Sequence, residues 1–244
     1  MVFGYQIISR VRMKQFYSLS QYPGKTGETY YRKFFKLKNL AYTYNALKCE
    51  NIVDSVNELK NSNASGFSVS MPYKSSVIPL LDKTDDLVIQ YNSCNTVVNV
   101  DGKYVGYNAD YYGVIHVLKT IPEYEPINIL GNGAMGNMFK KILGSRATIY
   151  SRSLGNWDQV QSVTGIVINC TSLGTSTKDS PFIKLPNVSH VIDLAMNDND
   201  LKKQTISSDI KYVSGKEFYL AQFKKQFEIY TGITLSQSEL EDDN

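Results

Sequence analysis

The chain has 244 residues, enough for one large domain or two small ones. Hydrophobic residues make up 42% of it and charged residues 20%, which is typical of a folded globular protein and excludes disorder and collagen-like repeats. The formal net charge is only +3, and the cationic residues are spread along the chain, so we expect no nucleic-acid partner.

The sequence has no run of about 18 apolar residues, and its N-terminus lacks the apolar stretch of a secretion signal. We therefore expect a cytoplasmic protein without a membrane partner. The three cysteines, Cys49, Cys94 and Cys170, are odd in number and widely spaced. This spacing favours buried free thiols over a disulfide framework or a zinc site, and we expect no metal.

The first half of the chain alternates strand and helix patterns. Short β-branched or aromatic runs predict strands at residues 15–19, 40–44 and 67–71. Between them, residues 28–37 and 52–60 carry apolar residues three and four positions apart, which is the spacing of amphipathic helices. The alternation is typical of an α/β unit, whose strands are joined by helical crossovers.

A β-hairpin is predicted next. Two β-rich runs, residues 95–100 and 103–107, flank an Asp-Gly pair, which tolerates the positive φ of a tight turn. A helix is predicted over residues 109–119. Residues 121–126 contain two prolines and show no periodicity, so we interpret them as a linker between domains.

Beyond this linker the alternation starts again, which predicts a second α/β unit with a parallel sheet. The predicted strands are residues 127–130, 147–150, 165–170 and 191–195, and the predicted helices are residues 135–143 and 215–230.

Residues 131–136 read Gly-Asn-Gly-Ala-Met-Gly and join a predicted strand to a predicted helix. In that position Gly131 permits a tight turn, Gly133 lets the backbone approach a pyrophosphate, and Gly136 lets the helix pack closely. The unpaired amides at the start of the helix attract the anion. A tight turn that binds no ligand can have the same sequence and is the alternative interpretation. The flanking strands favour nucleotide binding.

The next predicted strand ends at Ser151, Arg152 and Ser153. An NAD site usually has an acidic residue at this place, about twenty residues beyond the glycines, for the ribose 2′-hydroxyl. Two hydroxyls and a guanidinium instead suit a 2′-phosphate, which a carboxylate would repel. We therefore predict NADP rather than NAD, the alternative being that Arg152 is a solvated arginine at a strand end.

A second group of polar residues lies in the first unit. Ser68 and Ser70 alternate along a strand, so they point to one side of it, and Lys74 follows just beyond a proline. Asn95 and Asp110 lie at the edges of the hairpin and of the next helix. A lysine and a carboxylate that meet can hold each other in place and transfer protons. The spacing equally allows a surface lysine and a helix cap.

These segments resemble the shikimate dehydrogenase family over nearly the whole chain. Residues 66–74 are similar to the family's Asn-Val-Thr-x-Pro-x-Lys segment, and residues 94–96 are similar to its Val-Asn-Thr segment. Residues 106–110 resemble its Gly-x-Asn-Thr-Asp segment, and residues 169–174 resemble its Asn-x-Thr-Ser-x-Gly segment.

The resemblance implies an N-terminal α/β substrate domain, residues 1–120, which the C-terminal helix 216–244 joins. It also implies an NADP-binding Rossmann domain with a parallel sheet, residues 121–215, and a cleft between the two domains. The implied reaction is hydride transfer between NADPH and the ring ketone of 3-dehydroshikimate, with shikimate or a related acid such as quinate as the small-molecule partner. A monomer or a homodimer is expected.

The resemblance further implies roles for single residues. Lys74 and Asp110 match the catalytic pair, in which Lys74 would handle the proton at the substrate oxygen and Asp110 would orient and ionise that lysine. The implied substrate-binding residues are Thr26, Ser70, Asn95 and Gln222. The implied cofactor-binding residues are Gly131, Asn132, Gly133, Ala134, Met135, Ser151, Arg152, Ser153, Thr171, Ser172 and Gly215.

Several positions depart from the family pattern. Thr26 is the hydroxyl that remains where the family has a Ser-x-Ser segment, Ser68 replaces an asparagine, Ala109 a threonine and Met196 a tyrosine. Each lost polar partner costs on the order of 1–3 kcal/mol. The sequence is most similar to the shikimate-dehydrogenase-like branch, and a catalytically weak ligand-binding or regulatory module is the alternative function.

Overall fold

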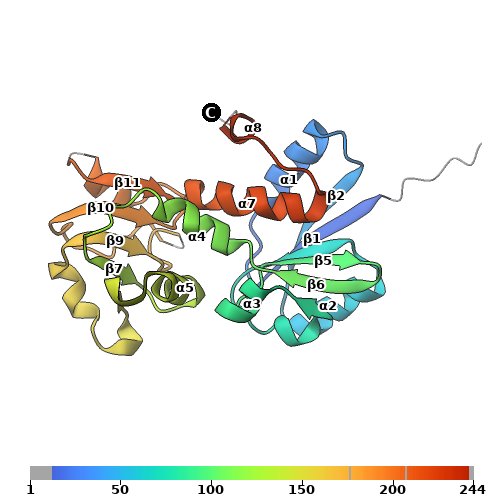
Figure 1. The fold of residues 1–244 in the computed structure, drawn as a ribbon, viewed down its shortest axis with the longest axis horizontal. Helices are drawn as coiled ribbons and strands as arrows, with labels where there is room; N and C mark the ends of the chain where they lie inside the picture. Colours follow the sequence, from blue (N-terminus) through green and yellow to red (C-terminus); the bar gives the residue numbers. More distant parts are fainter. Residues whose placement is uncertain (1–12, 176, 207, 242–244) are drawn as a thin grey trace, which may run out of the picture. The chain divides into compact units, whose positions relative to one another are not determined.

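The computed structural model describes residues 13–175, 177–206 and 208–241. The chain divides into two compact units, Met1–Asn108 and Ala109–Asn244, whose elements are labelled in Figure 1. The segment considered above for a secretion signal lies within residues 1–12, outside the described residues.

The first unit is built on a six-stranded sheet in the order β2-β1-β3-β5-β6-β4. Strand β1 pairs in parallel with β2 and β3, and β4 pairs in parallel with β6, whereas β5 is antiparallel to both β3 and β6. The strands are β1 (Lys14–Ser20), β2 (Tyr42–Lys48), β3 (Gly66–Val69), β4 (Lys83–Thr84), β5 (Thr96–Val100) and β6 (Lys103–Tyr107).

Two amphipathic helices connect the parallel strands of this unit. Helix α1 (Thr26–Leu37) buries an aromatic face, and helix α2 (Ile52–Asn61) buries an aliphatic one. The unit also contains α3 (Asp86–Tyr91) and the 3-10 turn η1 (Ile78–Leu80). The buried residues of α1 and α2 are Tyr31, Phe34, Phe35, Ile52, Val56 and Leu59.

The hairpin predicted from the Asp-Gly pair is present. Strands β5 and β6 are joined by Asp101 and Gly102, whose φ angles are 52° and 83°. A positive φ at both central residues is the requirement of the tight turn that matches the twist of a hairpin. This prediction is confirmed.

The second unit is built on a five-stranded sheet in the order β11-β10-β9-β7-β8, with parallel pairing throughout. The chain passes from β7 to β8 on one side and then crosses to β9 on the other side of β7. This reversal is the Rossmann-type arrangement, and the predicted parallel α/β unit is confirmed. The strands are β7 (Ile127–Leu130), β8 (Ala147–Tyr150), β9 (Gly165–Asn169), β10 (Val188–Asp193) and β11 (Lys211–Ser214).

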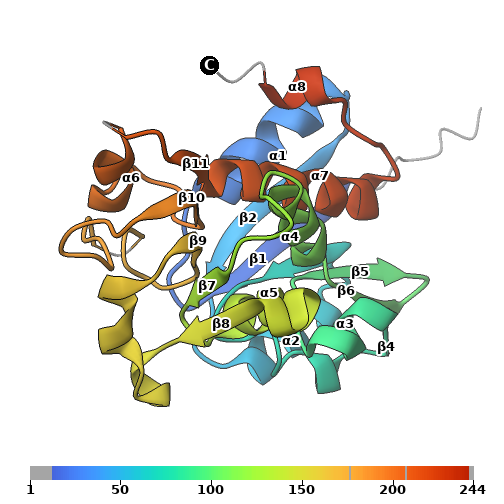
Figure 2. The same ribbon diagram turned by 60° about the vertical axis from the view of Figure 1, so that its left-hand side comes forward.

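Helix α4 (Asp110–Leu118) packs against helix α7 (Gly215–Thr231), and the two lie side by side in Figures 1 and 2. Both helices therefore belong to the second unit, and the division falls at Asn108, ahead of the proline-containing segment 121–126. The predicted domain bounds, which join the last helix to the N-terminal domain, stay a prediction.

The other helices of the second unit are α5 (Ala134–Leu143), α6 (Asp200–Thr205), α8 (Gln237–Glu241) and the 3-10 turns η2 (Gly144–Arg146), η3 (Arg152–Leu154) and η4 (Trp157–Ser162).

The ends of some strands differ from the prediction because pairing partners decide them. The strand expected at residues 40–44 is β2, which continues to Lys48 because it pairs with β1 along its whole length. The strand expected at residues 191–195 is β10, which starts at Val188 beside β9. Short elements such as β4, β11, α3 and α6 have too few residues to show a period.

Across residues 13–175, 177–206 and 208–241, none of the helices combines the length and the hydropathy that a membrane span requires.

A helix cap in the first unit gives a stability prediction. The side-chain oxygen of Asn51 accepts hydrogen bonds from the backbone N–H groups of Val53 and Asp54, at 2.9 and 3.4 Å. Asn51→Ala should lower the free energy of unfolding by about 1 kcal/mol because the first turn of α2 loses this acceptor. Asn51→Asp keeps an oxygen there and serves as the matched control in chemical denaturation. An alanine variant as stable as the aspartate variant would contradict the capping role.

Candidate functional site

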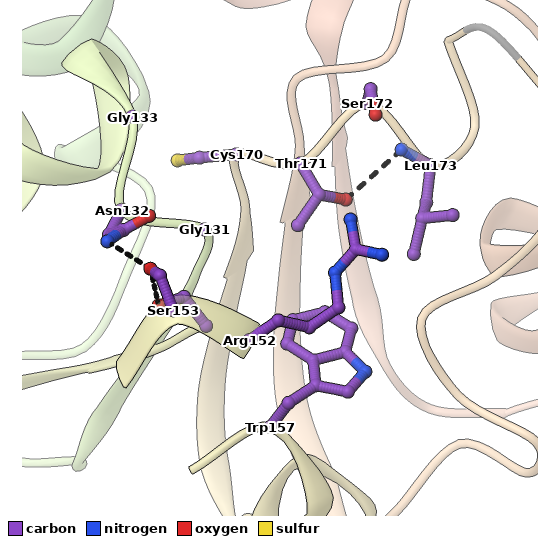
Figure 3. A pocket seen from close by; sticks show the side chains of 11 residues that line it. Gly131, Asn132, Gly133, Arg152, Ser153, Trp157, Cys170, Thr171, Ser172 and Leu173 are labelled. Atoms are coloured by element: carbon purple, nitrogen blue, oxygen red, sulfur yellow. Dashed lines mark hydrogen bonds between the residues drawn. The ribbon is translucent and has the colours of Figure 1, made fainter. Parts of the chain in front are cut away.

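A cavity of about 690 Å³ lies in the second unit at the carboxyl ends of β7, β8 and β9 (Figure 3). The loops that line it leave the sheet where the strand order reverses, which is where open α/β sheets bind ligands. The lining residues are Gly131, Asn132, Gly133, Ser151, Arg152, Ser153, Trp157, Cys170, Thr171, Ser172 and Leu173.

The loop after β7 turns sharply into α5. Gly131 has a φ of 97°, a conformation that favours glycine. A Cβ atom on Gly136 would overlap the carbonyl oxygen of Gly131, so the helix can pack on the loop only with glycine there. Gly133 precedes α5 and supplies no side-chain cap, which leaves the first amides of the helix open to an anion. The strand, turn and helix expected around these glycines are all present.

The loop after β8 carries Ser151, Arg152 and Ser153. The buried Ser151 hydroxyl accepts a hydrogen bond from the Leu154 N–H at 3.2 Å and lies 3.1 Å from the Ser153 hydroxyl. Ser153 also accepts from the Asn132 amide at 2.8 Å, which joins this loop to the glycine loop (Figure 3). Arg152 is exposed, and the lining contains no acidic residue.

The loop after β9 is held by the buried side chain of Asn169. Its oxygen accepts from the backbone N–H of Thr171 at 3.1 Å and from the Thr171 hydroxyl at 2.7 Å. The Thr171 hydroxyl in turn accepts from the Leu173 N–H at 3.2 Å (Figure 3). These bonds hold the three-residue turn against the end of the sheet.

Three lining residues, Trp157, Cys170 and Leu173, were not among the predicted site residues. The available signal was their position, because each follows a strand that ends at the cavity. Burial, with a contribution from the Asp193 carboxylate, raises the pKa of the Cys170 thiol. Cys170 therefore stays protonated and is a poor nucleophile.

Three predicted cofactor residues lie outside the cavity lining. Ala134 and Met135 form the first turn of α5, and Gly215 begins α7 next to the backbone of Leu194 and Ala195. The other predicted cofactor residues all line the cavity.

In the first unit, the segments that contain Ser70, Lys74 and Asn95 meet at the ends of β3 and β5. The Asn95 carbonyl accepts from the last N–H of β3 at 2.9 Å, and the Lys74 carbonyl accepts from the Cys94 N–H at 2.8 Å. Lys74 is half-buried and Ser70 exposed. The buried Asn95 side chain accepts from the Thr96 hydroxyl at 2.8 Å. Three predicted residues thus come from adjoining segments.

Ser68 lies on β3 and is bonded to a tyrosine. Its hydroxyl lies 2.6 Å from the Tyr44 hydroxyl, and the Tyr44 ring stacks on Tyr31 with the ring centres 4.0 Å apart. Burial raises the pKa of Tyr44 to about 12, so the phenol is neutral. Thr26, the first residue of α1, is exposed.

Asp110 and Gln222 belong to the second unit. Asp110 is the first residue of α4 and is 3% exposed, and Gln222 is 9% exposed on α7. Ala109, just before α4, is fully buried, and Met196 is 39% exposed beyond the end of β10. The pairing of Lys74 with Asp110 stays a prediction.

The cysteines are free thiols, and Cys49 and Cys94 are buried, as predicted. Within the ranges that the structure describes, no group of three or more His, Cys, Asp or Glu side chains is arranged to hold a metal ion.

Residues 28–97 match the family model of the shikimate dehydrogenase substrate binding domain. The chain is 29% identical over 228 residues to the shikimate dehydrogenase (NADP(+)) of Staphylococcus haemolyticus, a match that covers 81% of this chain and 85% of the relative. Many further curated proteins match as well.

The fold is similar to that of solved structures. The shikimate 5-dehydrogenase of Thermus thermophilus, crystallised with NADP(H) and shikimate, superposes with a TM-score of 0.80 at 19% identity, covering 94% of this chain and 98% of that one. A shikimate 5-dehydrogenase-like protein gives a TM-score of 0.80 at 21% identity, covering 95% and 96%.

The predicted similarity to the shikimate-dehydrogenase-like branch stays a prediction. The sequence matches begin in the first unit and extend through most of the chain, and the second unit has the fold and the glycine loop that the resemblance implied. Residues 28–97 thus match the family model, and most of the chain is similar in sequence to curated shikimate dehydrogenases and in fold to solved ones.

Proposed function

We propose that the protein is an NADP-dependent oxidoreductase that interconverts 3-dehydroshikimate and shikimate, or a closely related cyclic polyol acid such as quinate, by hydride transfer. The observation that carries this proposal is the cavity where the strand order reverses, lined by a glycine loop and by Arg152 in a chain similar to shikimate dehydrogenases. The curated relatives are named as enzymes of this specificity.

The residues of the cavity fit NADP. Among the described residues other than the two chain neighbours of Gly133, no atom lies within 4 Å of the place where its Cβ would be, so a pyrophosphate can approach the start of α5. Arg152 and Ser153 offer hydrogen bonds to a 2′-phosphate, and no carboxylate in the lining repels it. Bound NADP supplies or accepts the hydride.

Thr26, Ser70, Asn95 and Gln222 are proposed to bind the carboxylate and hydroxyls of the substrate. Ser70 and Asn95 support this proposal because they lie at the ends of neighbouring strands. The Ser68 hydroxyl is engaged with Tyr44, so the polar contacts differ from the family pattern. For this reason the proposal includes acids related to shikimate.

Lys74 is proposed to give a proton to the ketone oxygen as the hydride reaches the carbonyl carbon, and to take it back in the reverse direction. Asp110 is proposed to orient the Lys74 ammonium and keep it charged. The burial of Asp110 and the half-burial of Lys74 support this assignment, because a carboxylate and an ammonium shielded from water attract each other more strongly.

A second candidate function is a ligand-binding or regulatory module with little turnover. The fully buried Ala109 favours it, since this alanine stands next to the proposed catalytic Asp110 where the family pattern has a threonine. The two functions share the same ligands and differ in the rate of hydride transfer.

The remaining properties follow from the same proposal. We expect a cytoplasmic monomer or homodimer that acts on a small molecule and binds no nucleic acid.

The preference for NADP can be tested at Arg152. Arg152→Ala should raise the Kd of NADP+ by about tenfold to a hundredfold, because a charged hydrogen-bond donor to the 2′-phosphate is lost, and should leave the Kd of NAD+ within about twofold. Isothermal titration calorimetry measures both. Arg146→Ala is the matched control, because the Arg146 guanidinium donates to the Pro122 carbonyl at 3.1 Å and does not line the cavity. Equal losses for NADP+ and NAD+ would contradict the phosphate role.

The role of Lys74 can be separated from cofactor binding. Lys74→Ala should lower kcat by about a hundredfold to ten-thousandfold, because the oxygen loses its proton donor. The Kd of NADP+ should not change, since the lining of the cavity does not include Lys74. Lys83→Ala removes an exposed lysine of the same unit and should retain activity. If the Lys74→Ala variant turns over at the rate of the unchanged protein, Lys74 has no role in proton transfer.

Substrate identity and turnover are tested together. The unchanged protein should reduce NADP+ in the presence of shikimate or quinate. The absorbance of the reduced nicotinamide measures this reaction. Tight calorimetric binding of these acids without any absorbance change would favour the binding module. If both acids neither bind nor react, the proposed substrate class is wrong.

A further inference from the structure

Asp193 ends β10 with its carboxylate fully buried, and the proposed function gives it no role. One carboxylate oxygen accepts from the Asn169 amide at 2.9 Å and from the Ala195 N–H at 3.1 Å. The other accepts from the Asn199 amide at 2.7 Å and from the Tyr212 hydroxyl at 3.0 Å. A buried carboxylate is costly unless such bonds offset its desolvation, and here every donor is neutral.

The carboxylate holds the side chain from which the hydrogen bonds to the cavity start. The Asn169 NH2 group donates to Asp193 at 2.9 Å and to the Leu173 carbonyl at 3.2 Å, and its oxygen accepts from the N–H and the hydroxyl of Thr171. The backbone groups of Thr171 and Leu173 fix the direction of this amide, and Asp193 holds it in place from the buried side. The Thr171 hydroxyl therefore uses its single proton on Asn169, while one of its lone pairs accepts from the Leu173 N–H.

A hydroxyl oxygen has two lone pairs, so Thr171 keeps one for a ligand in the cavity that it lines. Thr171 can accept a hydrogen bond from that ligand but cannot donate one. The ligand group beside it must therefore be a donor.

The topology indicates which part of a dinucleotide lies there. Strand β7 separates β8, whose loop carries Arg152, from β9, whose loop carries Thr171. With the adenosine phosphate at the β8 loop and the pyrophosphate at the glycine loop, the nicotinamide half lies on the β9 side.

We propose that Asp193 is a positioning residue which, through Asn169, presents Thr171 as a hydrogen-bond acceptor to a donor group of the nicotinamide riboside half of the cofactor. This inference rests on the proposed function. In this inference, Asp193 at the buried end of β10 helps to bind the nicotinamide half of the dinucleotide.

The test compares NADP+ with 2′,5′-ADP, which lacks the nicotinamide half. Asp193→Ala removes the oxygen that holds Asn169, so it should raise the Kd of NADP+ by about tenfold or more and leave that of 2′,5′-ADP within about twofold, measured by calorimetry. Loss of a merely structural contact would weaken both ligands together.

Asp193→Asn combined with Asn199→Asp is the matched control. The Ala195 backbone N–H cannot reverse, so the new side chain at position 193 should keep its oxygen toward Ala195 and Asn169. Its NH2 group then faces position 199, where the Asn199 amide would oppose it donor to donor but the new carboxylate accepts from it, and the Tyr212 hydroxyl can turn to accept as well. This double variant should bind NADP+ within about threefold of the unchanged protein, because the oxygen that holds Asn169 is preserved. A loss as large as that of the alanine variant would overturn the inference.

A second variant keeps the test decisive if Asp193→Ala does not fold. Thr171→Val conserves the shape of the side chain and removes the acceptor, so it should show the same selective loss of NADP+, and Thr171→Ser should not. If the unchanged protein binds neither NADP+ nor 2′,5′-ADP, the proposed function fails. If it binds both and Thr171→Val binds NADP+ equally well, this inference alone fails.

Discussion

The candidate site depends on a steric contact between two stretches of backbone. Gly136 in the first turn of α5 lies so close to the carbonyl oxygen of Gly131 that no side chain fits between them. The contact brings the start of the helix to the end of β7, with its first amides directed out of the sheet edge. Because protein interiors are closely packed, a larger residue at this position would move the helix and its amides together.

The three loops around the cavity are held in different ways. The loops after β7 and β8 are joined to each other through Asn132 and Ser153. The loop after β9 is held instead from inside the unit, through Asn169 and the buried Asp193. The two walls of the cavity therefore have different hydrogen-bonded supports.

The features that could be predicted from the sequence are local ones. The hairpin and the turn after β7 follow from neighbouring residues, since Asp101, Gly102 and Gly131 themselves carry the positive φ angles. The predicted residues Arg152 and Thr171 line the cavity because they directly follow strands. The other features depend on contacts between residues distant in sequence. The role of Asp193 requires Asn169, which is 24 residues away, and the division of the chain at Asn108 requires two helices about a hundred positions apart to pack together.

Trp157 is the single tryptophan of the chain, and it borders the cavity. The indole emission of the folded protein therefore originates at one wall of this cavity alone. Any molecule that enters the cavity changes the surroundings of that fluorophore, whereas ligands held only by the first unit have no second indole to report them. The protein thus has a built-in optical reporter of cofactor occupancy that needs no label.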